Sequence, residues 1–350
     1  MSYNWEKATV GYNATVRDAL EIIDSEALRI ALVVDDKMAL LGVITDGDIR
    51  RGILAGCSLD ENVGFLMNSN PLVIAAASPR AYALKLMKEH NLLGVPRVQN
   101  GRLVGFEPLY ESLDIEKLDN LIFIMAGGFG SRLHPLTKNC PKPLLQLDGK
   151  PLLEIILEQF IAFGFVNFYI STHFLPEMIQ DYFGDGSKWQ VSIQYVHEDI
   201  PLGTGGALGL LPKDIIHRPM IMVNGDVLSK IDYRALLQFH NEENSVATMC
   251  VRDYEIKIPY GVVHGLDNKI IAMEEKPSHR FFINAGIYVL NPSVFESVEP
   301  NVYLDMPSLL QRYLDKGIDV SMFPIHEYWL DIGQPADYRK AQIDVGGLDL

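Results

Sequence analysis

A glycine-rich turn followed by two cations is the first candidate site in this sequence. Residues 126–130 read Ala-Gly-Gly-Phe-Gly, and Arg132 and Lys142 follow. Glycine permits positive φ and close approach of the backbone, so the N–H groups of such a turn can form a concavity that binds an anion. Loop amides and two cations together suit a nucleoside triphosphate. The turn lacks the Gly-Lys-Ser/Thr ending of a Walker loop, and Leu133 stands where a dinucleotide fingerprint needs a small residue.

Two aspartates that follow apolar residues form a second candidate site. Asp226 ends the segment Met-Ile-Met-Val-Asn-Gly-Asp, and Asp331 lies in Trp-Leu-Asp-Ile-Gly. A carboxylate in such a place is costly to desolvate unless it is paired or bound to a metal. Mg²⁺ is usually held by one or two carboxylates together with substrate phosphates and water. We therefore expect both aspartates to converge on one Mg²⁺ site, although either alone could simply stabilise a turn.

The elements that must position these residues alternate between short apolar runs and helical patterns. Residues 121–125 precede the glycine turn, and residues 220–223 precede Asp226. This alternation predicts a mostly parallel sheet with helices on both faces, with ligands beyond the C-terminal ends of the strands. A second glycine-rich segment, residues 198–207, opens a helix whose N-terminus favours an anion. A simple helix cap at Thr204 is the alternative interpretation.

One ordered series of residues resembles the signature of sugar-1-phosphate nucleotidyltransferases. It consists of Ala126-Gly127-Gly128-x-Gly130-Ser131-Arg132-Leu133, then Pro135-Leu136-Thr137, then Pro141-Lys142-Pro143. The resemblance runs from Leu121 to about Tyr338 and implies a Rossmann-like fold of the glycosyltransferase-A type. It implies that a sugar 1-phosphate and a nucleoside triphosphate give a nucleotide sugar and pyrophosphate. The attacking phosphate oxygen is already anionic, so catalysis needs positioning and charge stabilisation rather than a general base.

The resemblance also implies roles for individual residues. Arg132 and the loop amides would hold the β and γ phosphates, and Lys142 would neutralise the α-phosphate. Mg²⁺ on Asp226 and Asp331 would bridge nucleotide and sugar phosphate. The implied nucleotide contacts are Ala126, Gly127, Gly128, Gly130, Ser131 and Gly205, and the implied sugar-phosphate contacts are Glu198, Glu275, Lys276 and Asn284, with Glu198 on the sugar side.

Residues 1–118 contain two similar halves, about 1–60 and 61–118, each predicted to have the same order of helix and strands. The segment 42–48, Gly-Val-Ile-Thr-Asp-Gly-Asp, resembles cystathionine-β-synthase-type (CBS) domains. In that family a Thr and an Asp contact adenosine ribose and phosphate, which implies an adenine-nucleotide site at Thr45 and Asp48. A helix cap explains the same residue types. Residues 104–109 lack the Thr and Asp, so at most one site is complete. CBS pairs commonly associate face to face, which implies a homo-oligomer.

Composition limits the remaining possibilities. The formal net charge of −15 argues against non-specific binding of nucleic acid, which requires a basic surface. No apolar run approaches the roughly 20 residues of a membrane span. The three cysteines are far apart, which argues against a metal cluster and for a reducing compartment. Together with an N-terminus that lacks the apolar core of a signal peptide, these features predict a cytoplasmic protein.

We therefore expect an α/β protein. A CBS pair (α+β) over 1–118 precedes a Rossmann-like, mixed and mostly parallel sheet domain over 119–350, with a linker at 110–120. The presence of a CBS pair before such a domain, together with the segment 201–207, most resembles bacterial guanylyltransferases. These use GTP and glucosamine 1-phosphate or mannose 1-phosphate, and serve surface polysaccharide or legionaminic acid pathways. A uridylyl- or thymidylyltransferase is the alternative enzyme. A nucleotide-sensing scaffold with an inactive catalytic fold is the alternative without activity, and the intact cations and aspartates argue against it.

Overall fold

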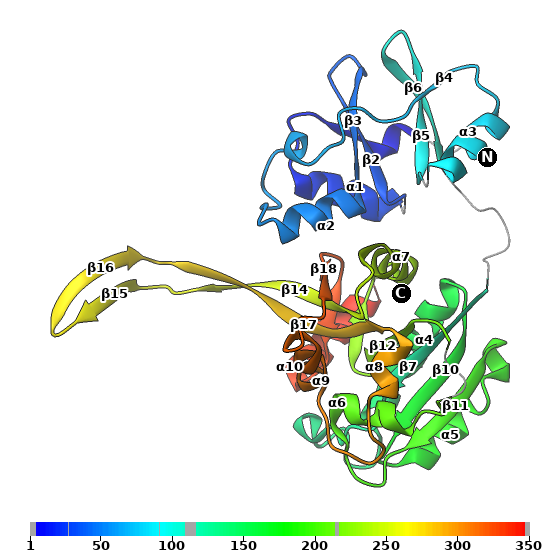
Figure 1. Cartoon of the computed structure of the whole chain (residues 1–350), viewed down its shortest axis with the longest axis vertical. Helices are drawn as coiled ribbons and strands as arrows, with labels where there is room; N and C mark the ends of the chain where they lie inside the picture. The colour runs from blue at the N-terminus through cyan, green and yellow to red at the C-terminus, as the bar shows by residue number, and fades with distance from the viewer. Residues whose placement is uncertain (1–4, 27, 91, 109–116, 214–216, 347–350) are drawn as a thin grey trace. The chain divides into compact units, whose positions relative to one another are not determined.

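The computed structural model describes residues 5–26, 28–90, 92–108, 117–213 and 217–346 (Figure 1). The chain divides into two compact units, residues 1–114 and 115–350. Most of the linker predicted at 110–120 lies outside the described residues. Leu118 begins a strand of the C-terminal unit.

The N-terminal unit has two halves of the same topology. In each half a three-stranded sheet has one parallel and one antiparallel pair, in the orders β1-β2-β3 and β4-β5-β6. The predicted duplication is therefore confirmed. The elements are η1 (Trp5–Ala8), β1 (Thr9–Gly11), α1 (Val16–Glu26), β2 (Ile30–Val34), β3 (Leu40–Thr45), α2 (Asp46–Leu54), η2 (Val63–Phe65), β4 (Ile74–Ala75), α3 (Arg80–Glu89), β5 (Gly94–Gln99) and β6 (Arg102–Pro108).

The C-terminal unit is built on a seven-stranded sheet of order β11-β10-β7-β12-β17-β14-β18. Its pairs are parallel except that β17 runs antiparallel to both of its neighbours. This confirms the predicted mixed, mostly parallel sheet. The strands are β7 (Leu118–Met125), β10 (Phe165–Thr172), β11 (Ser192–His197), β12 (Met220–Asn224), β14 (Ala247–Lys257), β17 (Ser278–Leu290) and β18 (Val320–Ile325).

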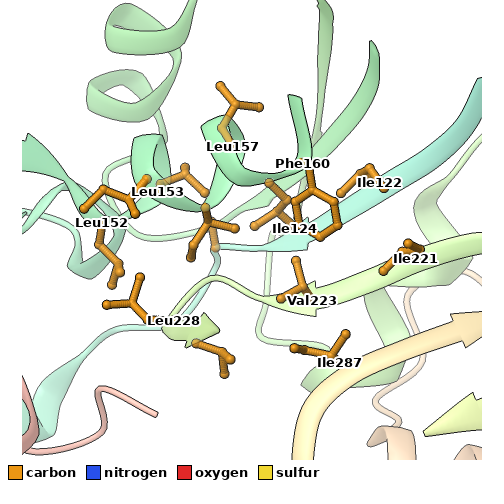
Figure 2. Close-up of a cluster of buried hydrophobic side chains, with 14 of the residues drawn as sticks. Ile122, Ile124, Leu152, Leu153, Leu157, Phe160, Ile221, Val223, Leu228 and Ile287 are labelled. Atoms are coloured by element: carbon orange, nitrogen blue, oxygen red, sulfur yellow. The ribbon is translucent and has the colours of Figure 1, made fainter. Parts of the chain in front are cut away.

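The part of strand β7 at residues 121–124 is buried on both faces, which explains the uninterrupted apolar run 121–125. Ile122 and Ile124 project into one core and Phe123 into a second core, because side chains alternate along a strand. Figure 2 shows the first core, where Phe160 of helix α4 (Leu152–Ala162) packs on the face of the sheet that carries Ile124. The sheet thus carries packed side chains on both sides, and its strand ends are held rigidly.

Helices and short elements complete the C-terminal unit. No helix in the part of the chain that the structure describes is long and apolar enough to cross a bilayer. The elements are η3 (Ser131–Leu133), η4 (Lys142–Leu144), β8 (Gln146–Leu147), β9 (Lys150–Pro151), α4 (Leu152–Ala162), α5 (Pro176–Phe183), η5 (Ser187–Trp189), α6 (Gly203–Gly206), η6 (Ala207–Leu210), β13 (Val227–Ser229), α7 (Tyr233–Glu243), α8 (Pro292–Glu296), α9 (Met306–Leu314), β19 (Trp329–Asp331) and α10 (Pro335–Val345).

The helix that residues 198–207 were predicted to open forms only as one α-helical turn, α6, followed by the 3-10 turn η6. Glycine is a poor helix former, and this segment has four between 203 and 209. The glycines have a packing role. A Cβ on Gly206 would lie 2.5 Å from Val302 O, and one on Gly209 would lie 2.6 Å from Glu299 O. Glycine is therefore needed at 206 and 209 for this segment to pack closely against the chain near residue 300, and the same glycines shorten the helix.

Strands β14 and β17 continue beyond the sheet as a two-stranded ribbon. The hairpin of β15 (Gly261–Leu266) and β16 (Lys269–Glu275) forms the end of this ribbon, which projects away from the sheet in Figure 1. β14 pairs with β18 only as far as Arg252. Beyond that residue the ribbon has no further strand beside it among the described residues. No feature of the sequence predicted this projection.

Candidate active site

The adjacent ends of β7 and β12 form the floor of the candidate site. Gly225 N–H donates to Met125 O at 2.8 Å, and a Cβ on Gly225 would lie 2.6 Å from that oxygen. Glycine is therefore required where the chain leaves β12. A cavity of about 270 Å³ opens at this edge, as expected for the C-terminal ends of such strands. It is lined by Met125, Ala126, Gly127, Gly128, Lys142, Pro143, Glu198, Pro201, Gly203, Thr204, Asn224, Gly225, Asp226 and Asp305.

Lys142 and Asp226 form an ion pair in this cavity. Lys142 Nζ lies 2.6 Å from Asp226 Oδ2, and only 8% of the lysine is exposed. The 3-10 turn η4 holds Lys142 between two prolines, and Leu145 N–H donates to its carbonyl oxygen. A lysine is seldom buried unless it is paired. The pair therefore fixes one cation and one anion beside the glycine turn.

The short pair β13–β19 brings Asp331 to the same edge. Asp331 stands opposite Val227, the residue after Asp226, and Ile332 N–H donates to Asp226 O at 2.9 Å. Asp331 as a whole is exposed to solvent, but its carboxyl group is partly buried. Burial of this carboxyl, and then the negative charge of Asp226, raise the pKa of Asp331 above its ordinary value.

Arg132 is the second cation near these carboxylates. A Cβ on Gly333 would lie 3.5 Å from Arg132 Nη1 and 3.6 Å from Asp331 Oδ1, so both side chains approach this glycine. The positive charges of Lys142 and Arg132 both lower the pKa of Asp331 and partly offset the effect of Asp226. The site thus contains two cations, Lys142 and Arg132, and two anions, Asp226 and Asp331.

The donor set of this site fits Mg²⁺. Asp226 and Asp331 supply two carboxylates from neighbouring strand segments, which is the number that Mg²⁺ commonly takes from a protein when phosphates complete its shell. Besides burial, which is the larger cause, the negative charge of Asp226 raises the pKa of Asp331. A divalent cation between the carboxylates would relieve the repulsion between their charges.

The glycine turn has two parts with different environments. Ala126, Gly127 and Gly128 line the cavity. Gly130 has a φ of 61° and its carbonyl accepts a 2.7 Å hydrogen bond from Thr137 Oγ1. A Cβ there would lie 3.0 Å from Thr137 Cγ2, so only glycine fits without strain. Gly130 therefore shapes the turn, and neither it nor Ser131, which begins η3, is among the residues that line the cavity.

Glu198 is buried at the cavity wall directly after β11. It is 4% exposed, and its Oε2 accepts a 3.0 Å hydrogen bond from Leu202 N–H. Its Oε1 has no hydrogen-bond partner among the described residues. A Cβ on Gly127 would lie 2.8 Å from this oxygen, so the carboxylate lies against the glycine turn. A buried acceptor without a partner costs about 1–3 kcal/mol, which a bound donor would recover.

Besides Gly130 and Ser131, four more of the predicted contact residues are not among those that line the cavity. Gly205 N–H donates to Leu304 O at 2.7 Å, so its amide is used within the fold. The side chain of Asn284 donates to Tyr288 Oη at 2.6 Å and accepts from Gly286 N–H at 2.9 Å. Glu275 and Lys276 are exposed on the ribbon that leaves the sheet, with 3.9 Å between their charged groups.

The structure adds two residues that the sequence analysis did not propose as contacts. Asn224 lines the cavity, and its buried Oδ1 has no partner among the described residues. Its position at the end of an apolar strand, two residues before Asp226, is a sequence feature that could have identified it as a contact. Asp305 also lines the cavity, where it accepts a 3.4 Å hydrogen bond from Thr204 N–H. It is about a hundred residues away in sequence, and no local pattern indicates it.

In the N-terminal unit, Thr45 and Asp48 form a capping box at the start of α2. Thr45 Oγ1 donates to Asp48 Oδ2 at 2.6 Å, and Asp48 N–H donates back to Thr45 Oγ1 at 3.2 Å. Arg51 Nη2 lies 2.6 Å from Asp48 Oδ1. The capping interpretation of these residues is therefore correct. It does not exclude a ligand, because the cap lies at a helix N-terminus.

Comparison with known proteins agrees with this site. Residues 122–346 match the family described as "Nucleotidyl transferase", and residues 5–55 and 63–106 match the CBS domain. The mannose-1-phosphate guanyltransferase of Schizosaccharomyces pombe is 34% identical over 230 residues, which cover 61% of each chain. The D-glycero-alpha-D-manno-heptose 1-phosphate guanylyltransferase of Aneurinibacillus thermoaerophilus is 33% identical, over 63% of this chain and 95% of that protein.

Solved structures give the same result. HddC from Yersinia pseudotuberculosis, complexed with GMP-PN, superposes with a TM-score of 0.50 and 26% identity, over 65% of this chain and 99% of HddC. The present chain spans about three fifths of the length of most curated relatives that it matches. Since the family match covers residues 122–346, more than half of the chain, this protein belongs to the nucleotidyl transferase family, with two CBS domains before the transferase unit.

Proposed function

We propose that this protein is a sugar-1-phosphate guanylyltransferase that converts GTP and a sugar 1-phosphate into a GDP-sugar and pyrophosphate. The observation that carries the proposal is the cavity in which Lys142, Asp226 and the glycine turn meet. Relatives with 32–34% identity are named as guanylyltransferases for mannose 1-phosphate or a heptose 1-phosphate, which supports the same reaction class.

The reaction needs positioning and charge stabilisation. An oxygen of the sugar phosphate attacks the α-phosphorus of GTP, and the bond to the β-phosphate oxygen breaks, so pyrophosphate leaves with the electron pair. Lys142, which is buried and paired with Asp226, would stabilise the negative charge that grows on the α-phosphate, and a preorganised cation of this kind lowers the barrier. Arg132 and the amides of the glycine turn would hold the β and γ phosphates. Mg²⁺ on Asp226 and Asp331, when bound, supplies further neutralisation of the phosphates.

Glu198 supports guanine as the base. Guanine presents two adjacent donors, N1–H and N2–H₂, to a group that only accepts hydrogen bonds. The free Oε1 of Glu198 faces the glycine turn in the cavity, where a flat base could lie. Uracil and thymine have one donor between two carbonyl oxygens, which a carboxylate would repel. This assignment moves Glu198 from the sugar side, where the family resemblance placed it, to the base.

The sugar is the least constrained part of the proposal. Mannose 1-phosphate, glucosamine 1-phosphate and a heptose 1-phosphate are the candidates, and surface polysaccharide or legionaminic acid pathways would use the product. The test is release of pyrophosphate over a matrix of GTP, UTP, dTTP, ATP and CTP with these sugar phosphates, with Mg²⁺ present. Turnover with UTP or dTTP in place of GTP would favour the alternative uridylyl- or thymidylyltransferase. No release with any pair would favour a non-catalytic sensor.

For the N-terminal unit we propose one adenine-nucleotide site at Thr45 and Asp48 that regulates the transferase, and association of the CBS pairs into a homo-oligomer. The complete motif at 42–48, next to the incomplete one at 104–109, supports a single site per chain. A ligand there can change activity only through different affinities for two states of the assembly, typically about 1–3 kcal/mol. A cytoplasmic location fits the substrates of such an enzyme.

A further inference from the structure

The ribbon of residues 253–282, here called the arm, has one apolar and one charged side near its base. Tyr254 pairs with Phe281, and Ile256 follows two residues later on the same side. On the other side Asp253 and Arg280 form a 2.7 Å ion pair. Such alternation is normal for a strand that covers a core. Here both strands leave the sheet, so the apolar side of the arm has no core of its own to cover.

The exposed apolar surface of the arm is large. Ten large apolar side chains on it expose between 39% and 74% of their surface. If each leaves about 100 Å² in contact with water, half of what a large side chain can bury, the arm exposes roughly 1,000 Å². These side chains lie on both faces of the ribbon, since Phe281 and Phe282 are consecutive in β17, as are Ile270 and Ile271 in β16. Together they expose an area similar to the roughly 800 Å² that each partner buries in a stable interface. The ten residues are Tyr254, Ile256, Tyr260, Val263, Leu266, Ile270, Ile271, Met273, Phe281 and Phe282.

The arm is also poorly suited to exist alone. An isolated two-stranded ribbon is marginally stable in water, and a third strand or a packed face is needed for independent stability. Charge indicates what can approach it. The arm has five acidic and four basic residues, whereas the whole chain has a net charge of −15. Two copies of this chain repel each other over most of their surface, and the arm is a nearly neutral region where they can meet.

Two expected sugar-phosphate contacts lie far out on the arm. Strand β17 passes the cavity at Gly286, where a Cβ would lie 2.6 Å from Asn224 Nδ2. Lys276 precedes Gly286 by ten residues of extended chain, on the order of 30 Å, which no side chain spans. The ribbon does not fold back between them, because its pairing continues from Lys257 with Ser278 to Gly261 with Glu275. Among the described residues that line the cavity, none comes from the arm.

We propose that the arm is exchanged between two copies of this chain, so that Glu275 and Lys276 of one copy complete the sugar-phosphate site of the other. This rests on the proposed function for the chemistry of the site. Reciprocal exchange covers the apolar side of both arms. It also brings the cation of Lys276, together with the carboxylate of Glu275, to a cavity that would receive two anionic substrates. The described lining of this cavity has one cation, Lys142, beside Asp226, Glu198 and Asp305. Each active site then contains residues from two chains.

The decisive experiment is complementation between two inactive variants. Asp226→Ala has a defective cavity and an intact arm, and Lys276→Ala has the reverse. The two full-length chains carry different tags and are co-expressed, and the mixed dimer is isolated through both tags. Exchange of arms restores one complete site of two, so we expect about half of the wild-type kcat per dimer, against almost none for either variant alone. Lys269→Ala, another exposed arm cation, is the matched control and should keep wild-type turnover.

Three results would overturn the exchange. A mixed dimer no more active than its parents would mean that the arm acts within its own chain or lies against the N-terminal unit. Wild-type turnover by Lys276→Ala would mean that the arm supplies no contact. Wild-type turnover by a triple variant with Tyr254→Ser, Ile256→Ser and Phe281→Ser would mean that the apolar side is dispensable. These three residues are about half exposed, so their replacement leaves the fold of the chain intact.

A second readout does not depend on activity. A photoreactive benzoylphenylalanine in place of Met273 should form a covalent dimer after irradiation, with the adduct in the transferase unit of the other chain. An adduct within the same chain, or no adduct, would overturn the proposal. Covalent dimers from a protein that releases no pyrophosphate with any substrate pair would leave the exchange standing and refute the proposed function instead. The two proposals can therefore fail separately.

Discussion

The change Glu198→Gln should shift the nucleotide preference from GTP towards UTP and dTTP. The glutamine is nearly the same size, and its oxygen can still accept the hydrogen bond from Leu202 N–H, so the loop keeps its anchor. The amide nitrogen then takes the place of Oε1, the buried atom without a partner. A group that accepted hydrogen bonds in the cavity becomes one that donates them.

The expected magnitude follows from the loss of one pair of hydrogen bonds to the base. A good bidentate contact contributes about 1–3 kcal/mol of discrimination between bases. At 1.36 kcal/mol for each factor of ten, kcat/KM for GTP should fall about 5- to 150-fold. The value for UTP or dTTP should rise or stay constant, because an amide N–H₂ can donate to a base carbonyl that a carboxylate repels.

The assay is kcat/KM for each nucleotide at a saturating concentration of the sugar phosphate, for wild type, Glu198→Gln and Asp305→Asn. Asp305 lines the same cavity, but its carboxylate already accepts hydrogen bonds from Thr204 N–H and Tyr303 Oη, so its replacement should leave the order of preference unchanged. An equal fall for all nucleotides would make Glu198 only a support for the loop. A rise confined to the KM of the sugar phosphate would return Glu198 to the sugar side and refute the reasoning about the base.

Three further predictions concern the metal ligands, Lys142 and the N-terminal unit. Asp226→Ala and Asp331→Ala should each abolish Mg²⁺-dependent turnover in a protein that still folds, with a lower melting temperature for Asp226→Ala because the buried Lys142 loses its partner; near wild-type activity would remove that residue from the metal site. Lys142→Ala should lower kcat about 10²–10³-fold, the usual effect of losing one preorganised donor, and an effect on the KM for GTP alone would instead indicate uniform binding. In calorimetric titrations, Asp48→Ala should eliminate binding of one adenine nucleotide per chain, and unchanged binding would leave the N-terminal unit as an association module only.

Features that depend on neighbouring residues could be predicted from the sequence. The apolar run before the glycine turn predicted a buried strand, and residues 121–124 of β7 are buried on both faces. The apolar run 220–223 before Asp226 likewise predicted a strand, and β12 covers Met220–Asn224. Such elements are determined by local periodicity and by breakers such as proline and glycine, which the sequence displays directly.

Features that depend on contacts between distant segments could not be predicted. Asp305 reaches the cavity because Gly205 N–H and Gly206 N–H both donate to Leu304 O, which joins segments about a hundred residues apart. The projection of the arm depends equally on tertiary contacts. Its strands have ordinary alternation, and only the end of the pairing between β14 and β18 at Arg252 shows that the ribbon leaves the sheet. A local pattern specifies that a strand exists, but not which surface covers it.

The ion pair between Lys142 and Asp226 connects the fold to the proposed chemistry. Removing one partner of a buried pair leaves an uncompensated charge, which costs several kcal/mol. If the triphosphate draws Lys142 to the α-phosphate while a divalent cation takes its place beside Asp226, each group exchanges one opposite charge for another and neither is left unpaired. Nucleotide and Mg²⁺ should then bind more tightly together than separately. Measured in the Lys276→Ala background to limit turnover, the affinity for GTP should rise when Mg²⁺ is added, and this rise should shrink in Lys142→Ala. An equal rise in both proteins would show that the ion pair takes no part in the exchange.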